Sequence, residues 1–157
     1  MKIILSVLII GILTTGCTTR NAFSKLDITK EQEAAIENTR SGKITSSKQL
    51  EGIYSAIYLN NVYQNEEAKH YNFYISMYLK NKTNDLNITL NKQEAVLLEK
   101  LPEKNKYAEL LGLKVPWTNN YFVSFKRDEN NESAKLILQI DNDQFSSGQL
   151  TYVREQL

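Results

Sequence analysis

The feature that most constrains the fold is a strict alternation of side chains along residues 71–80. Apolar residues and mostly polar ones take turns there: Tyr71, Phe73, Ile75, Met77 and Leu79 against Asn72, Tyr74, Ser76, Tyr78 and Lys80. Successive side chains of a β-strand point to opposite faces of its sheet, so a period of two over about ten residues predicts a half-buried strand. The chain must therefore provide partner strands and a core for one face of this segment.

Similar patterns recur later in the chain, at residues 86–91, 121–126, 136–141 and 150–154. Turn-forming residues separate them, at 81–85, 128–132 and 141–148. About six or seven short strands joined by turns predict a mainly β domain, and we expect an antiparallel β-sandwich. The strand pattern resembles that of immunoglobulin-like envelope domains, without indicating a specific family.

Two short helices are expected beside the strands. Thr29 followed three residues later by Gln32 is a capping-box signature, and it predicts a surface helix over residues 29–40 that stops at Ser41-Gly42. A second short helix is expected within residues 102–112, inserted between strands.

Residues 50–63 fit two structures. The apolar spacing of Leu50, Ile53, Tyr54 and Ile57 suits a helix, whereas the abundance of β-branched and aromatic residues suits a strand. We favour a strand over residues 53–63.

The first residues form a different kind of segment. Lys2 precedes an apolar run at residues 3–13, which is shorter than the roughly twenty residues of a membrane-spanning helix but long enough for the core of a signal peptide. Small residues follow and end in the only cysteine of the chain, in Thr14-Thr15-Gly16-Cys17. This arrangement resembles the lipobox of bacterial lipoprotein precursors.

The resemblance implies that the Cys17 sulfur carries a diacylglycerol and that cleavage occurs just before Cys17, followed by acylation with a fatty acid such as palmitate. Residues 1–16 would be the signal peptide, 17–28 a lipidated tether and 29–157 a single domain. A lipidated cysteine also explains why no second cysteine is present to form a disulfide. The alternative is an ordinary secretory signal with an incidental cysteine.

In bacterial lipoproteins, the residue after the lipidated cysteine bears on localisation. Thr18 follows the cysteine where an aspartate usually means retention in the inner membrane. The expected location is therefore the bacterial cell envelope, at the outer membrane and facing the periplasm.

The charge of the chain argues against nucleic acid as a partner. The formal net charge is +1 and becomes 0 when Lys2 is removed with the signal peptide. No block of basic residues is present, so the electrostatic attraction that nucleic-acid binding needs is missing. The membrane, through the lipid anchor, and an envelope protein or glycan are the partners expected.

The sequence offers little chemistry. His70 is the only histidine, and no nucleophile elbow, phosphate loop or HExxH motif is present. Asp141-Asn142-Asp143 suits either a calcium loop or an ordinary turn, and we favour the turn. We therefore predict no catalytic residue, no metal site and no cofactor, although a Ser-His-Asp triad assembled by the fold is not excluded by spacing.

Tyrosines supply a candidate recognition face. Tyr74 and Tyr78 share the polar face of the predicted strand, and Tyr54 and Tyr58 would join them if residues 53–63 form the neighbouring strand. Tyrosine beside small polar residues suits recognition of a sugar or a peptide. The alternative is that a helix covers this face.

Two segments read acid-x-Asn-x-Ser/Thr, at residues 85–89 and 129–133. This spacing resembles the extended acceptor of bacterial periplasmic N-glycosylation and makes Asn87 and Asn131 candidate acceptors. The alternative is chance in a chain rich in asparagine.

Three functions follow from these observations. The first is a membrane-anchored envelope lipoprotein that acts as a non-catalytic binding module. The second is a structural or assembly accessory that docks on another envelope protein. The third and weakest is a hydrolase with an unrecognised site. A cleft containing His70 and carboxylates would favour the enzyme, an exposed tyrosine patch would favour ligand binding, and an exposed aliphatic edge strand would favour docking.

Overall fold

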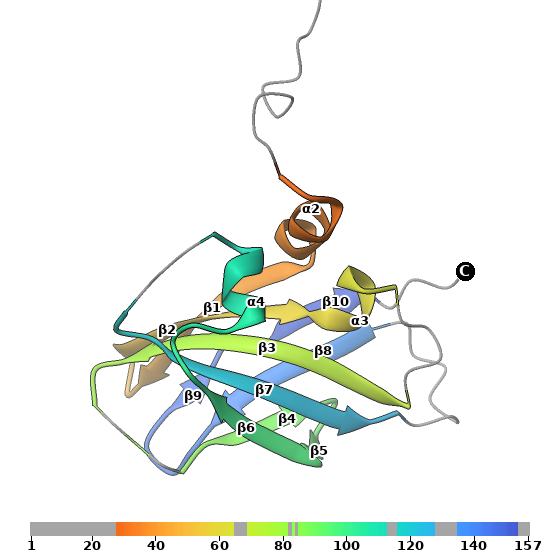
Figure 1. The fold of residues 1–157 in the computed structure, drawn as a ribbon. Coiled ribbons are helices and arrows are strands. Elements are labelled where there is room, and N and C mark those ends of the chain that lie inside the picture. The colour runs from red at the N-terminus through yellow and green to blue at the C-terminus, as the bar shows by residue number, and fades with distance from the viewer. Residues whose placement is uncertain are drawn as a thin grey trace, which may run out of the picture.

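The computed structural model describes residues 28–64, 69–81, 83, 85–112, 116–127 and 135–153. These residues form mainly strands, with three short helices (Figure 1). In chain order the elements are α2 (Lys30–Glu37), β1 (Thr39–Ser46), β2 (Gln49–Tyr58), α3 (Leu59–Val62), β3 (His70–Leu79), β4 (Asn87–Leu90), β5 (Gln93–Glu94), β6 (Leu97–Leu101), α4 (Lys106–Leu110), β7 (Asn119–Lys126), β8 (Lys135–Asp141), β9 (Ser146–Ser147) and β10 (Leu150–Val153).

All of these strands belong to one antiparallel sheet, in the order β5-β4-β8-β9-β1-β2-β3-β7-β6, with β10 paired to β8. The strands at the two ends of this order, β5 and β6, are neighbours in the chain and are separated only by Ala95 and Val96. The stretch Gln93–Leu101 therefore pairs with β4 at its start and with β7 at its end, so the sheet curls until its two ends meet.

This architecture confirms a mainly β, antiparallel fold. The immunoglobulin-like sandwich is not confirmed, because the strands of the described segments belong to one curled, hydrogen-bonded sheet.

The main core lies on the concave side of the sheet, where almost every strand contributes buried side chains. Aromatic rings make up its centre. The ring of Phe73 lies 5.1 Å from that of Tyr58, 5.9 Å from that of Phe125 and 5.2 Å from that of Tyr152. Rings from β2, β3, β7 and β10 thus contact one another, and the interior is filled by side chains.

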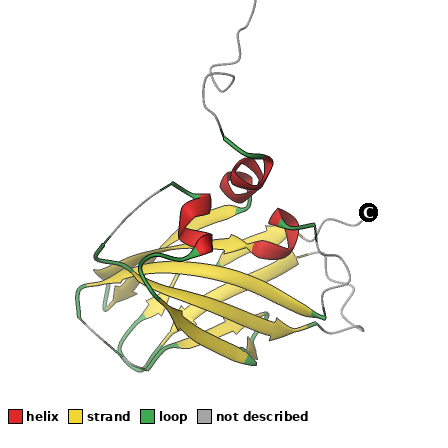
Figure 2. Ribbon diagram, in the orientation of Figure 1, coloured by secondary structure: helices red, strands yellow, loops and turns green. Residues whose placement is uncertain are grey.

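A second, smaller core lies on the outer face of the sheet, under the helices. All three helices gather over one side of the sheet (Figure 2). Their buried side chains pack against Ile57 and Tyr74, which lie on neighbouring strands; those from the helices are Ala35, Leu59, Val62 and Leu110.

The predicted N-terminal helix is present but shorter than expected. The Thr29 side chain accepts a hydrogen bond from the Gln32 N–H while the Gln32 side chain accepts one from the Thr29 N–H, so the capping box is confirmed. The predicted stop at Ser41-Gly42 is wrong, because α2 ends at Glu37 and these residues lie inside β1. Gly42 serves a different purpose: a Cβ at this position would lie 2.6 Å from Cε1 of Tyr54 on β2.

The other predicted elements are found with shifted ends. Residues 50–63 form a strand for most of their length, as favoured, and then the single turn of α3. The helix expected within residues 102–112 is α4, and Asn105 caps it by accepting hydrogen bonds from two backbone N–H groups. Strands β1, β5, β6 and β9 were not predicted. No helix of the described segments is long and apolar enough to cross a membrane.

Candidate functional site

The predicted tyrosine face does not exist as one exposed surface. Tyr54, Tyr58 and Tyr74 are each only 2% exposed, whereas Tyr78 is 38% exposed. The prediction is therefore wrong for three of the four residues, and Tyr78 alone lies at the surface.

The pairing of β2 with β3 explains why two of these tyrosines lie inside. Ile57 is opposite Tyr74, and Tyr58 is opposite Phe73. Residues that are directly opposite share a face, so Tyr58 and Tyr54 belong to the concave face with Phe73 and the main core. A difference of one residue in register moves every side chain of a strand to the other face.

Tyr74 does lie on the outer face, but α4 covers it. Its ring centre is 5.8 Å from that of Tyr107, and its hydroxyl donates a 2.9 Å hydrogen bond to Oδ1 of Asn120 on β7. Burial raises the pKa of the Tyr74 hydroxyl above its usual value. This tyrosine therefore attaches α4 to the sheet, which is the alternative in which a helix covers the face.

The polar residues give no arrangement for catalysis among the described segments. His70 is exposed at the first position of β3, where its carbonyl oxygen accepts a hydrogen bond from the Asn60 side-chain amide. In these segments no three His, Cys, Asp or Glu residues are grouped closely enough to hold a metal ion. Their buried side-chain nitrogen and oxygen atoms all have hydrogen-bond partners; Ser147, for example, accepts one from the Ile140 N–H.

The loop after β8 forms a turn through its own side chains. Oδ1 of Asn142 accepts hydrogen bonds from the N–H groups of Gln144 and Phe145, both at 2.8 Å. Oδ1 of Asp141 accepts one from the Ser146 hydroxyl at 2.6 Å. The turn chemistry favoured from the sequence is therefore present, and Asp143 is left exposed beside it.

Of the candidate modification sites, only Asn87 lies within the described residues. It is an exposed residue at the start of β4, where it is paired with Asp141 of β8. Cys17 and Asn131 both lie outside the described residues.

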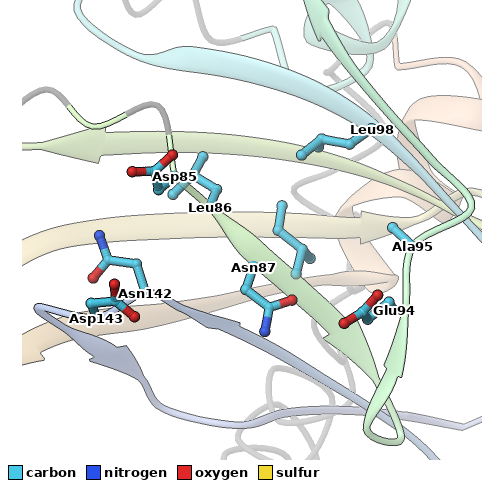
Figure 3. Close-up of a pocket in the computed structure, with 9 residues that line it drawn as sticks. Asp85, Leu86, Asn87, Glu94, Ala95, Leu98, Asn142 and Asp143 are labelled. Atoms are coloured by element: carbon cyan, nitrogen blue, oxygen red, sulfur yellow. The ribbon is translucent and has the colours of Figure 1, made fainter.

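The structure shows a cleft that the sequence analysis missed. It has a volume of about 410 Å³, which is within the range of binding pockets. Figure 3 shows its walls, which come from the β4 segment, from the β5–β6 segment and from the loop after β8. The lining residues are Asp85, Leu86, Asn87, Ile88, Glu94, Ala95, Leu98, Asn142 and Asp143.

The cleft arises because two neighbouring stretches of the sheet diverge. β4 pairs with β5 only at Thr89↔Glu94 and Leu90↔Gln93. Beyond this short hairpin the chain turns toward β7, to which the Val96 N–H donates a 2.9 Å hydrogen bond at the Ser124 carbonyl. The earlier half of β4 continues to pair with β8, so a gap opens between the two stretches.

The cleft combines an apolar floor with acidic ends. Leu86 and Ala95 pack against the main core from opposite sides of the cleft. Figure 3 shows Asp85 and Asp143 toward one end and Glu94 toward the other, and all three are exposed. A ligand here would contact aliphatic carbon in the middle and carboxylates at both ends.

Exposed aliphatic side chains continue from the cleft through Val96 into the first two residues of β6. Val96, Leu97 and Leu98 are 58%, 47% and 42% exposed. Sequence reasoning passed over this stretch because it does not alternate. The signal that was available is the run of four apolar residues at 95–98, bounded by charged residues.

The chain was also compared with known proteins. No family model, curated protein or solved structure matches it.

Proposed function

We propose that the protein is a lipid-anchored, non-catalytic module of a bacterial cell envelope that docks on another envelope protein through β6. The observation that carries this proposal is the run of three exposed aliphatic side chains at Val96, Leu97 and Leu98. Leu97 and Leu98 point to opposite faces of β6, so both sides of this end strand present an exposed aliphatic side chain. Exposed apolar side chains on an end strand favour protein binding, because burying them removes apolar area from water.

The position of β6 in the sheet supports docking by strand addition. In the described segments β6 pairs with β7 along one edge, and no strand pairs with its other edge. Such an edge offers backbone N–H and C=O groups to an incoming strand, and natural proteins usually block it with charge, proline or a covering element. Leu97 and Leu98 are exposed and uncharged, so this part of the edge stays available to an incoming strand.

The lipid anchor is a separate part of the proposal and is supported by the signal-like start and by Cys17. Anchoring at the outer membrane, facing the periplasm, would hold β6 close to proteins of the same compartment. Acylation at the cysteine would give firm attachment, because several chains bind a bilayer far more strongly than one.

Docking fits the structure better than the other two functions. The glycan-binding or peptide-binding tyrosine face is reduced to Tyr78, since the other three tyrosines are buried. For the hydrolase, a cleft with His70 would be expected, and His70 is not among the residues that line the cleft described above.

The proposal is tested by placing a charge on the edge strand. Leu97→Lys should remove a complex that the lipidated wild-type protein forms in its native envelope, measured as a size shift on native gels after mild detergent extraction. Ile36→Lys is the matched control, because Ile36 is 55% exposed but lies on α2. Equal retention of the complex in both variants, or a wild-type protein that migrates as a free monomer, would count against docking through β6.

A further inference from the structure

We propose that the cleft between β4 and the β5–β6 segment binds an extended, positively charged polypeptide segment of the partner. This inference rests on the proposed docking function and specifies the chemistry of what is docked. It starts from the divergence of two strand edges that would be neighbours in a fully paired sheet.

The backbone on both sides of the cleft suits an extended chain. Asn87 and Ile88 pair with β8 on one side, whereas on the cleft side the ladder of described residues is limited to Thr89 and Leu90. A strand inserted beside residues 86–88 would continue this ladder by main-chain hydrogen bonds. An extended segment is therefore the shape that the gap in the sheet accommodates.

The side chains of the cleft define the charge of its occupant. Asp85, Glu94 and Asp143 are the ionisable residues among those that line it, and all three are acidic. Because two lie toward one end and one toward the other, a segment with positive side chains on both sides of an apolar centre would match them. Leu86 and Leu98 would contact that apolar centre.

A metal ion fits this cleft less well than a peptide. No three acidic, histidine or cysteine residues of the described segments are close enough together to hold an ion. The Asn142 side-chain oxygen, which also borders the cleft, already accepts two hydrogen bonds within its own turn. Carboxylates that are spread along a cleft instead suit several separated positive groups.

The test uses defined peptides and the mature lipidated protein in detergent. The first probe is a blocked, fluorescent peptide with a Val-rich centre and Lys residues on both sides of it. The second has Glu in place of Lys, and the third carries N-methyl groups that prevent strand pairing. Fluorescence anisotropy should show binding of the Lys peptide that weakens with added salt, and little binding of the other two, because both charge and backbone pairing are required.

Charge removal on the protein provides the second arm. The triple variant Asp85→Asn, Glu94→Gln, Asp143→Asn should bind the Lys peptide about tenfold more weakly, as expected for losing three exposed charge pairs. The matched control removes three exposed carboxylates on the helical side, in Glu37→Gln, Glu103→Gln, Glu109→Gln, and should leave binding unchanged.

The outcomes separate this inference from the docking function. Equal binding of the Lys and Glu peptides, equal binding of the N-methylated peptide, or equal loss in both triple variants would overturn the cationic-strand inference. A complex that depends on Leu97 but not on these carboxylates would leave docking through β6 intact and overturn only the inference. Binding of the Lys peptide without any Leu97-dependent complex would support the peptide-binding cleft and overturn docking through β6.

Discussion

The ring of Tyr107 on α4 lies 5.8 Å from the ring of Tyr74 on β3, with 33° between the ring planes. Tyr107 also stacks on Phe122 of β7, at 5.7 Å and 14°. A single aromatic side chain from a five-residue helix therefore covers two neighbouring strands. The residues on this face of β3 alternate with the core residues as solvent-exposed residues would. The contact with α4 nevertheless makes the face part of the second, smaller core.

The first prediction compares the two tyrosines of β3. Tyr74→Ser should lower the free energy of unfolding by about 3 kcal/mol or more, because it removes a buried ring and its hydrogen bond to Asn120. Tyr78→Ser should change it by no more than about 0.5 kcal/mol, since Tyr78 is at the surface. Urea denaturation measures both. Equal, small effects would show that α4 does not cover Tyr74 in solution.

The second prediction concerns alkaline pH. Burial holds the pKa of Tyr152 far above its usual value, so the folded protein keeps this proton at pH values where the unfolded chain, with a pKa of about 10, has lost it. The stabilising contribution is therefore complete below about pH 10 and decreases above it, by about 1.4 kcal/mol per pH unit.

Tyr152→Phe removes this dependence, at a cost at neutral pH of about 1 kcal/mol for the lost hydrogen bond to the Ala56 carbonyl. Between pH 9 and 11 the variant should lose about 1 kcal/mol less stability than the wild-type protein. Parallel decreases in the two proteins would contradict the assigned burial.

Much of the sheet could be predicted from the sequence because its central strands alternate. The alternation at 71–80 matches β3, where Phe73 is buried and Tyr78 exposed. Alternation cannot predict which elements cover the outer face of a strand. Tyr74 and Tyr78 have equivalent positions in the alternating pattern, but Tyr74 is buried because residues 106–110 fold over it. The register between β2 and β3 could not be predicted either. The observed register places Tyr58 opposite Phe73, on the concave face.

The cleft could not be predicted because no single segment contains it. Its lining comes from residues 85–88, from residues 94, 95 and 98, and from residues 142–143, which only the strand pairing brings together. Strand β6 was overlooked because apolar residues are consecutive there. Such a run is as typical of a buried strand or helix as of an exposed edge strand that binds a partner.

The third prediction concerns glycosylation. Asn87 is held in a strand pair with Asp141, and an oligosaccharyltransferase needs an extended acceptor that is free to enter its site. In a host that has the acid-requiring enzyme, Asn87 should therefore carry less glycan than Asn131, whose acceptor status stays a prediction from its sequence alone. Glu129→Gln should suppress modification at Asn131. Glycopeptide mass spectrometry measures both occupancies, and a higher occupancy at Asn87 would contradict the prediction.

The fourth prediction concerns the anchor. Cys17→Ser should abolish lipidation and leave either an uncleaved precursor or a soluble periplasmic protein, because the sulfur is the atom that receives the diacylglycerol. Membrane fractionation with intact-mass analysis distinguishes these forms. A cleaved Cys17→Ser protein that still fractionates with membranes would show that Cys17 is not the anchor.

The fifth prediction addresses the docking edge itself, and site-specific photocrosslinking in living cells of the native host is its most direct test. A photoreactive residue at Leu97 and one at Leu98 should each give the same discrete adduct with one envelope protein. A photoreactive residue at Ile53 should not, although Ile53 is 53% exposed, because it lies on β2 and pairs within the sheet. Adducts that are absent at Leu97, or that are equally strong at Ile53, would contradict docking through β6.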